Sequence, residues 1–259
     1  MFSAGAMIYF IGAGPGASDL ITVRGADILR KAERIVYAGS LVNHEIVAEY
    51  SREGCEVFDS SSMTLEEISD CLISGHESGL VTVRLHSGDP AIFGAVREQM
   101  NILRAKGIPF EVVPGVSSLF AASSALKTEY MIPGGTQTLI ITRHEGRTPV
   151  PKAEGLISLA CHRSSIAVFL SAGMIESVCA ELIAGGYEAD TPAAVVCRAS
   201  WPDERIIRGT LATLPGLAKG ITKSAIILAG NFLNDNTDSQ SKLYDKNFSH
   251  EYRNSSLHT

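Results

Sequence analysis

The sequence predicts an α/β protein made of two α/β domains, the first with a mainly parallel sheet and the second with a mixed sheet. In the first half of the chain, short apolar segments that end at glycine turns alternate with helical segments. This pattern is typical of parallel strands joined by right-handed crossovers. After about residue 130 the apolar segments follow one another with fewer helices between them. The 259 residues are enough for two modest domains with a substantial core.

The first domain is expected to cover residues 7–116. Its first apolar segment is followed by a helical stretch to about Lys31, and Thr64 with Glu67 forms the pattern of a capping box before another helix. Pro90 stands at a suitable first position for the helix that precedes the last strand. The strands are expected at residues 7–11, 34–38, 55–58, 80–85 and 110–113.

The second domain is expected to cover residues 117–233. Two of its strands are separated by a short segment around Trp201 and are expected to pair as an antiparallel hairpin. Residues 234–259 contain few apolar side chains, so a disordered polar tail is expected, and residues 1–6 are expected to form a short disordered leader. The strands are expected at residues 138–142, 166–170, 193–198, 205–208 and 225–229.

Composition argues against several classes of function. The net charge of −6 provides no general basic surface for nucleic acid, and no apolar run reaches the roughly 20 residues of a membrane span. The N-terminus lacks the pattern of a signal peptide. The five cysteines form no close pair, and the seven histidines show no zinc-binding spacing. We therefore expect a cytoplasmic protein that uses no membrane, no nucleic-acid partner and no protein-bound metal.

A glycine-rich loop, Gly12–Ala17, follows the first predicted strand. It formally fits the dinucleotide-binding fingerprint, which allows alanine at its last position. Two features argue against NAD: Pro15 removes one backbone N–H from a phosphate-binding turn, and the second strand ends in residues 37–40 without the acid expected to bind the ribose. A tight strand-to-helix turn without any ligand explains the glycines equally well.

Two further loops follow predicted strands of the same domain. The loop Ser87–Gly94 contains Asp89, which could accept hydrogen bonds from a ligand, although capping of the next helix is favoured by position alone. The loop Pro114–Ser118 contains Ser117, whose hydroxyl could contact a ligand or cap a helix. Open parallel sheets bind ligands beyond the carboxyl ends of their strands, so both loops are suitably placed for a binding site.

Together, the three loops resemble those of the tetrapyrrole methyltransferase family. This family has a glycine-rich opening with proline, a Gly-Asp-Pro loop followed by an apolar residue and Phe-Gly, and a Pro-Gly-Val-Ser-Ser type of turn. The order and spacing match over about residues 7–233. The resemblance is greatest to the subgroup that methylates C11 of precorrin-4 or cobalt-precorrin-4. The segments that match this subgroup are residues 37–42, 59–68, 142–143 and 146–151.

The resemblance implies an enzyme that uses S-adenosylmethionine to methylate a corrin precursor in cobalamin biosynthesis and releases S-adenosylhomocysteine. The family has two α/β domains with the methyl donor in the cleft between them, and it is usually a homodimer. Carried over by motif, the donor-binding residues are Pro15, Ser87, Gly88, Asp89, Ile92, Phe93, Ser117, Ser118, Ser171 and Ala194.

The substrate implied by the resemblance is a macrocycle with many carboxylates, which arginine binds well. Arg143 and Arg147 lie in a matching segment and His86 lies beside the Gly-Asp-Pro loop, so all three are candidate substrate contacts. The alternatives are solvated arginines and an ordinary hydrogen-bonding role for His86.

The sequence identifies no catalytic residue. No Gly-x-Ser-x-Gly elbow is present, and methyl transfer requires none. In the uroporphyrinogen methylases an acid follows the tyrosine that matches Tyr37, whereas Ala38 and Gly39 stand here. A base role for that acid therefore cannot be transferred to this chain.

Three other functions stay open at this stage. The first is a family member that methylates another corrin position, an RNA ribose or a diphthamide intermediate; the second is a dinucleotide-binding oxidoreductase. The third is a non-catalytic protein that binds or carries a tetrapyrrole. The matching segments argue against the first, Pro15 and the absent ribose acid against the second, and the complete set of three loops against the third.

Overall fold

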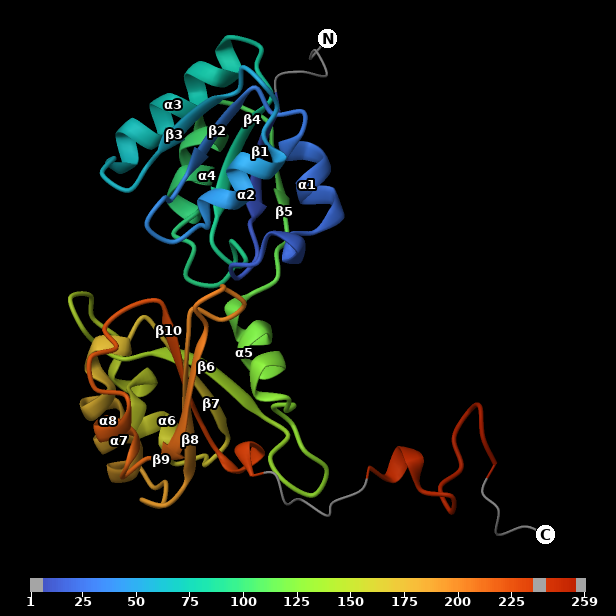
Figure 1. The fold of residues 1–259 in the computed structure, drawn as a ribbon, viewed down its shortest axis with the longest axis vertical. Coiled ribbons are helices and arrows are strands. Elements are labelled where there is room, and N and C mark those ends of the chain that lie inside the picture. The colour runs from blue at the N-terminus through green and yellow to red at the C-terminus, as the bar shows by residue number, and fades with distance from the viewer. Residues whose placement is uncertain (1–6, 235–240, 255–259) are drawn as a thin grey trace. The chain divides into compact units, whose positions relative to one another are not determined.

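The computed structural model describes residues 7–234 and 241–254. The described residues form two compact units, of which the first holds residues 7–121 together with Arg198–Glu204. The second holds Ala122–Cys197 with residues 205–234 and 241–254. Each unit contains one five-stranded sheet (Figure 1). The sequence predicts one continuous division between residues 116 and 117, whereas the first unit extends to Ala121 and also includes the later segment Arg198–Glu204.

The sheet of the first unit is parallel throughout, as the sequence predicts. Its strand order is β3-β2-β4-β1-β5, so the first strand lies between the two strands that carry the other glycine loops. The elements are β1 (Ile8–Gly12), η1 (Ser18–Leu20), α1 (Val23–Leu29), β2 (Arg34–Tyr37), α2 (His44–Tyr50), β3 (Glu56–Asp59), α3 (Leu65–Glu77), β4 (Thr82–His86), α4 (Arg97–Ala105) and β5 (Phe110–Val113), followed by α5 (Ser118–Leu126).

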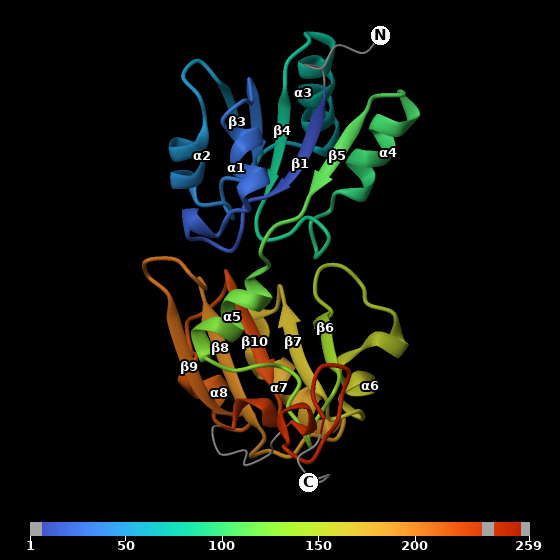
Figure 2. The ribbon, with the colours of Figure 1, turned by 90° about the vertical axis from the view of Figure 1, so that its right-hand side faces the viewer.

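Helices cover both faces of this sheet, because successive side chains of a strand point to opposite faces. Ile11 and Leu85 pack with α1 and α2 in one apolar cluster, whereas Phe10 packs with α3 and α4 in another. Figure 2 shows the two helix layers on either side of the strands. Burial on both faces explains why the strands read as continuous apolar runs in the sequence.

Two helix predictions are wrong at their starts. The stretch predicted to run to Lys31 is divided, because Thr22 is extended (φ −68°, ψ 146°) and its side chain caps a new helix at the N–H of Gly25. The helix predicted from Pro90 begins only at Arg97. The backbone between these two positions turns through left-handed residues, which a right-handed helix cannot contain. The capping box at Thr64 is confirmed.

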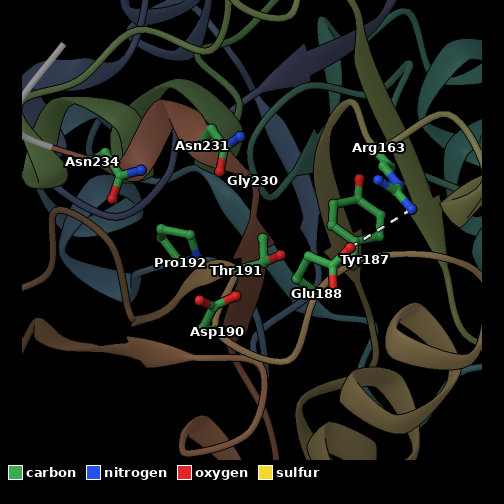
Figure 3. Close-up of a pocket in the computed structure, with 9 residues that line it drawn as sticks. All are labelled: Arg163, Tyr187, Glu188, Asp190, Thr191, Pro192, Gly230, Asn231 and Asn234. Carbon is green, nitrogen blue, oxygen red and sulfur yellow. Dashed lines mark ion pairs between the residues drawn. The ribbon is translucent and has the colours of Figure 1, made fainter.

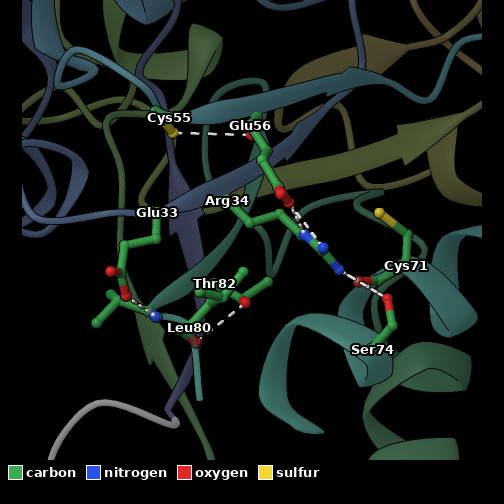
Figure 4. A network of polar contacts seen from close by, with 9 residues as sticks. Glu33, Arg34, Cys55, Glu56, Cys71, Ser74, Leu80 and Thr82 are labelled. Carbon is green, nitrogen blue, oxygen red and sulfur yellow. Dashed lines mark hydrogen bonds and ion pairs between the residues drawn. The ribbon is translucent and has the colours of Figure 1, made fainter. Parts of the chain in front are cut away.

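A polar network occupies the amino-terminal edge of the first sheet (Figure 4). The guanidinium of Arg34 on β2 pairs with the Glu56 carboxylate on β3 at 2.7 Å. Its Nη1 donates to the Cys71 carbonyl and to the Ser74 hydroxyl on α3, at 2.8 and 2.7 Å. These bonds join two strands and a helix at the edge opposite to the glycine loops, so we interpret the network as structural.

The sheet of the second unit is mixed, as predicted. Its order is β6-β7-β10-β8-β9; β6 and β7 are parallel and the other neighbours are antiparallel. Helices α6, α7 and α8 pack on one face around a single apolar cluster. The elements are β6 (Leu139–Arg143), η2 (Lys152–Glu154), α6 (Leu156–Ala160), β7 (Ser165–Phe169), η3 (Ala172–Met174), α7 (Ile175–Ala184), β8 (Pro192–Cys197), β9 (Arg205–Thr210), α8 (Leu214–Leu217), β10 (Ala225–Ala229), η4 (Asn231–Leu233) and η5 (Lys242–Tyr244).

The hairpin predicted around Trp201 is confirmed, since β8 and β9 pair antiparallel and Cys197 lies opposite Arg205. The predicted disordered leader lies outside the described residues. Residues 235–240 and 255–259 of the predicted tail also lie outside the described residues. Between these, Arg253 donates to the carbonyls of Leu243 and Asp245 around the short η5 turn.

The sequence leads us to expect no disulfide bond, no membrane-spanning segment and no protein-bound metal, and the described residues can be compared with each expectation. All five cysteines are free. Within residues 7–234 and 241–254, no helix is long and apolar enough to cross a membrane. The same residues contain no cluster of three or more His, Cys, Asp or Glu side chains that could hold a metal ion.

Candidate functional site

The three loops singled out in the sequence meet at one edge of the first sheet. They follow β1, β4 and β5, which are neighbours and run parallel. In register, Gly12 lies beside His86 and Ile11 lies beside Val113, so the three strands end at the same level. Parallel neighbouring strands place the loops after them side by side, and a ligand site is expected at this edge.

Backbone contacts lock the first and second loops together. The N–H of Gly14 donates to the Gly88 carbonyl at 3.2 Å, and the N–H of Gly88 donates back to the Gly14 carbonyl at 2.8 Å. The third loop is equally close, because a Cβ added at Gly115 would overlap the Gly88 carbonyl oxygen and the Gly12 Cα. Glycine at positions 12 and 115 is therefore required by the approach of three backbones rather than by one turn.

Asp89 holds the second loop against the third. One carboxylate oxygen accepts from the N–H of Ala91 at 2.8 Å, and the other accepts from the N–H of Gly115 at 2.8 Å. The capping role favoured by its position is wrong, because α4 begins eight residues later at Arg97. Both oxygens of Asp89 thus bind backbone, and its effect on a ligand would act through the geometry of the two loops.

Three side chains from elsewhere in the first unit bind the backbone of the Gly12–Ala17 loop. Trp201 Nε1 donates to the Pro15 carbonyl at 2.9 Å, and the Ala17 N–H donates to the Ser200 hydroxyl at 3.0 Å. Asn43 Nδ2 donates to the Gly16 carbonyl at 3.0 Å. The Arg198 guanidinium lies 3.9 Å from the Trp201 ring centroid, and this cation–π contact helps to hold the Trp201 side chain against the loop.

These bonds weaken the dinucleotide alternative further. A phosphate-binding glycine loop needs several free backbone N–H groups. In this loop the N–H of Gly14 is used by Gly88 and that of Ala17 by Ser200, while Pro15 has none. None of the three loops contains a lysine or arginine. The first loop therefore offers few free backbone donors to a pyrophosphate, and no basic side chain of the three loops compensates for them.

The second loop also presents apolar side chains next to this backbone junction. Ile92 is half-buried, and Phe93 is 43% exposed. Phe93 and Ala95 have φ values of 54° and 48°, which non-glycine residues rarely adopt. Strain of this kind persists only where the surroundings fix it, and it is frequent at ligand sites.

The serines of the third loop differ in their roles. Ser117 is buried, and its hydroxyl accepts from the N–H of Leu119 at 3.2 Å, which confirms the capping alternative. Ser118 is half-buried at the first position of α5. Ser87 is half-buried and Gly88 is buried at the junction.

Gly39 has a structural partner that explains its small size. The Asp59 carboxylate on β3 accepts from the Gly39 N–H at 2.9 Å and from the Ser61 N–H at 2.9 Å. These backbone bonds lower the pKa of Asp59. A Cβ at position 39 would overlap this carboxylate. A carboxylate thus lies at the end of β2, although it comes from the neighbouring strand.

His86 and Arg84 are buried on the same face of β4. Burial, together with the Arg84 charge, lowers the pKa of His86 to about 3, so its ring is neutral at physiological pH. The expected hydrogen-bonding role of His86 is not confirmed, because its Nε2 atom is buried without a partner among the described residues. Its ring instead stacks on Phe10, with 6.1 Å between the centroids.

The structure does not bring together the two donor-binding residues that are expected in the second domain, Ser171 and Ala194. Ser171 is fully buried after β7, where its hydroxyl accepts from the His144 N–H at 2.9 Å and donates to the Phe169 carbonyl at 2.6 Å. Ala194 is fully buried within β8. Through β10 it lies level with Ala167 of β7, four residues before Ser171, so the sheet does not bring these two residues together.

The two candidate arginines have different surroundings. The Arg143 guanidinium donates to the carbonyls of Thr148 and Pro149, at 3.1 and 2.7 Å, and so fixes the loop that follows β6. Arg147 lies exposed in that loop and makes no hydrogen bond or ion pair within the described part of the chain. Only Arg147 keeps its full set of donors available to a substrate.

A cavity of about 360 Å³ lies elsewhere in the second unit (Figure 3). It opens where β8 begins and β10 ends, at the edge of the sheet opposite to Ser171. Arg163 and Glu188 pair across part of it at 3.7 Å. None of the donor-binding residues implied by the resemblance lines this cavity, and neither do Arg143, Arg147 and His86. Its lining residues are Arg163, Tyr187, Glu188, Asp190, Thr191, Pro192, Gly230, Asn231 and Asn234.

Sequence reasoning missed the residues that support the loops rather than form them. Asn43, Ser200 and Trp201 bind the first loop from distant positions, the last two across more than 180 residues of sequence. The one signal available was that Trp201 is the only tryptophan and stands in a predicted turn.

Comparison with known proteins agrees with this geometry. The family model of the tetrapyrrole (corrin/porphyrin) methylases matches residues 7–215. A cobalt-precorrin-4 C(11)-methyltransferase of Methanocaldococcus jannaschii is 50% identical over 250 residues, which cover 96% of each chain.

Solved structures give the same result. The structure of the cobalamin biosynthetic enzyme cobalt precorrin-4 methyltransferase, CbiF, matches with a TM-score of 0.86 and 46% identity, covering 88% of this chain and 96% of that one. The uroporphyrin-III C-methyltransferase of Thermus thermophilus, complexed with S-adenosylhomocysteine, matches with a TM-score of 0.73 and 26% identity, covering 88% and 93%. With a family model over most of its length and a relative at half identity, the chain belongs to the tetrapyrrole (corrin/porphyrin) methylase family.

Proposed function

We propose that this protein transfers a methyl group from S-adenosylmethionine to C11 of precorrin-4 or cobalt-precorrin-4 in cobalamin biosynthesis. The observation that carries the proposal is the junction of three loops at the carboxyl edge of β4, β1 and β5 in a chain half identical to a cobalt-precorrin-4 C(11)-methyltransferase. The matching segments at residues 37–42 and 59–68 favour this position over other tetrapyrrole positions.

The residues at the loop junction fit a sulfonium donor better than a phosphate-bearing cofactor. A sulfonium is a cation, and the three loops carry no lysine or arginine that would repel it. Ile92 and Phe93 present apolar surface suited to an adenosyl group next to the backbone junction of the loops. We propose Pro15, Ser87, Gly88, Ser117, Ser118, Ser171 and Ala194 as further donor contacts, and we propose that Asp89 acts on the donor through the two loops that its carboxylate joins.

The bound donor supplies an electrophilic methyl group, so the protein needs no nucleophile of its own. Its residues must align the donor with the substrate carbon, and this orientation can lower the barrier substantially. The hydrogen bonds of Asp89 to Ala91 and Gly115 keep two loops rigid before the donor binds. Such preorganisation avoids the loss of conformational entropy during binding.

Arg147 is the residue we propose as the first contact for a substrate carboxylate, because its guanidinium is exposed and unpaired in the described chain. Arg143 supports the Arg147 loop, and a direct contact from it would require loss of its carbonyl bonds. His86 is neutral and buried, so any contact of it with substrate would be that of an uncharged ring at the end of β4.

We also propose that the enzyme works in the cytoplasm as a homodimer. The five free cysteines suit a reducing compartment. Sedimentation equilibrium of the purified chain tests the dimer, and a single species of monomer mass would contradict it. Fractionation of cells that express the protein from its own promoter tests the location.

The function itself is tested in two steps. Isothermal titration measures binding of S-adenosylhomocysteine, with NAD as the control ligand; saturable binding of the former alone is expected. The purified enzyme is then incubated with precorrin-4 or cobalt-precorrin-4 and S-adenosylmethionine carrying a carbon-13 methyl group. The expected product gains one methyl, which NMR places at C11. Binding of NAD instead, or a methyl at another ring position, would contradict the proposal.

A further inference from the structure

A buried amide on α4 supports the strained part of the second loop. Gln99 is 4% exposed, and its Nε2 donates to the Ala95 carbonyl at 3.2 Å. Its Oε1 accepts from Arg84 Nε at 3.2 Å. The side chain thus joins the centre of the sheet to the loop that follows β4.

The direction of this amide is fixed by its two partners. A guanidinium has only donors, so it requires the oxygen of Gln99, and a backbone carbonyl has only acceptors, so it requires the nitrogen. Arg84 is itself held, because its Nη1 donates to the Val36 carbonyl at 3.2 Å. Arg84 is 5% exposed and has no carboxylate partner among the described residues, so loss of the Gln99 oxygen would leave a buried cation short of an acceptor.

The carbonyl that Gln99 binds belongs to a strained turn at residues 93–95, which needs contacts from the surrounding structure to stay in place. Phe93 and Ala95 both have positive φ, and a Cβ added at Gly94 between them would overlap the Pro90 carbonyl oxygen. Non-glycine residues remain in this region only when surrounding contacts determine it. The same turn carries Ile92 and Phe93, for which we propose contact with the methyl donor.

We infer that Gln99 is a positioning residue for the methyl donor. Arg84 fixes the Gln99 side chain, and Gln99 in turn fixes the Ala95 carbonyl. The turn that carries Ile92 and Phe93 is thereby held in place for the donor. The inference rests on the proposed function. It predicts that loss of the Gln99–Ala95 bond weakens donor binding even when the buried contact to Arg84 is kept.

The substitution Gln99→Glu separates the two bonds. A carboxylate keeps an acceptor for Arg84 and gains an ion pair, and the adjacent guanidinium keeps it ionised. It has no N–H for the Ala95 carbonyl, and the two acceptors repel each other. We expect thermal stability close to that of the wild type, but about ten-fold weaker binding of S-adenosylhomocysteine, the effect of one hydrogen bond. In turnover, KM for S-adenosylmethionine should rise more than kcat falls.

The matched control is Thr82→Val. Thr82 is fully buried on the same face of β4, at the other end of the strand, where its hydroxyl donates to the Leu80 carbonyl (Figure 4). This nearly isosteric change removes a buried polar group without touching the loop. It should leave the affinity for S-adenosylhomocysteine and the loop unchanged.

Hydrogen exchange on the free proteins provides a second readout that does not depend on any ligand. Amides of residues 89–97 should exchange faster in Gln99→Glu than in the wild type and in Thr82→Val. Unchanged exchange and unchanged affinity in Gln99→Glu would overturn the positioning role. If the wild type itself does not bind S-adenosylhomocysteine, the proposed function fails, whereas the exchange rates still decide whether Gln99 anchors the loop.

Discussion

Replacing Asp89 by alanine should cost stability as well as affinity for the methyl donor. The carboxylate accepts two hydrogen bonds of 2.8 Å, from Ala91 and from Gly115 in a separate loop. Hydrogen bonds to a charged group contribute about 1.5 kcal/mol at the weaker end of their range, which suits a half-buried side chain, so loss of both should lower the free energy of unfolding by about 3 kcal/mol. Asp89→Asn keeps one acceptor oxygen and should lose about half as much.

Urea unfolding followed by tryptophan fluorescence measures this loss in the relevant unit. Trp201 is the only tryptophan, and it is bound to Pro15 in the first loop, so its signal reports the first unit. The control is Asp27→Ala, which removes an exposed i,i+3 pair with Arg30 and should change the free energy of unfolding by less than about 0.5 kcal/mol.

Titration with S-adenosylhomocysteine on the same variants completes the test. The loops should separate without the carboxylate, so affinity should fall in parallel with stability, alanine more than asparagine. A large loss of affinity in Asp89→Ala without a loss of stability would refute the reasoning. It would show that the carboxylate binds the ligand directly and that its contacts with backbone contribute little.

Three further changes test other parts of the site. Gly115→Ala should cost about 3 kcal/mol, because its Cβ overlaps the Gly88 carbonyl, whereas Gly216→Ala, with open space around it, should change the free energy of unfolding little; chemical unfolding compares them. For His86 the folded pKa of about 3 is below the unfolded value of 6.5, so the unfolded state binds the extra proton. Between pH 6.5 and about pH 3, stability should therefore fall by up to about 1.4 kcal/mol for each pH unit that is lost, and urea unfolding of His86→Phe should lack this contribution. Arg147→Ala should raise KM for the tetrapyrrole at unchanged Tm, whereas Arg143→Ala should also lower Tm, because only Arg143 holds its loop.

Each of these changes has an outcome that contradicts its argument. A Gly115→Ala variant as stable as the wild type would mean that the three loops are less close than the structure shows. Equal slopes of stability against pH in the wild type and His86→Phe would mean that His86 is solvated. A lower Tm for Arg147→Ala would mean that this side chain has a structural partner.

The strands and their classes were predictable because their information is local. The apolar runs at residues 7–11 and 80–85 have the length and glycine boundaries of buried strands, and the strands observed there are Ile8–Gly12 and Thr82–His86. The hairpin at residues 193–208 was also predictable, because two strands with few residues between them have little choice of partner. Helix starts were less predictable. The left-handed residues after Pro90 are Phe93 and Ala95, and because neither is a glycine, the sequence gives no signal that the backbone turns there.

The sequence alone determined the family, through three loops whose order and spacing are set by the chain. Only the tertiary structure decided what each residue in those loops does. Asp89 and Gly115 are 26 positions apart, and Trp201 reaches Pro15 across 186 positions. Such pairs depend on strand order and on the return of a hairpin segment to the first unit, and neither leaves a periodic signal in the sequence. Backbone groups form hydrogen bonds whatever side chain they carry, so the residue type does not predict which backbone groups a side chain will bind. The role of Asp89 as a link between two loops therefore depends on the tertiary structure, which brings those loops side by side.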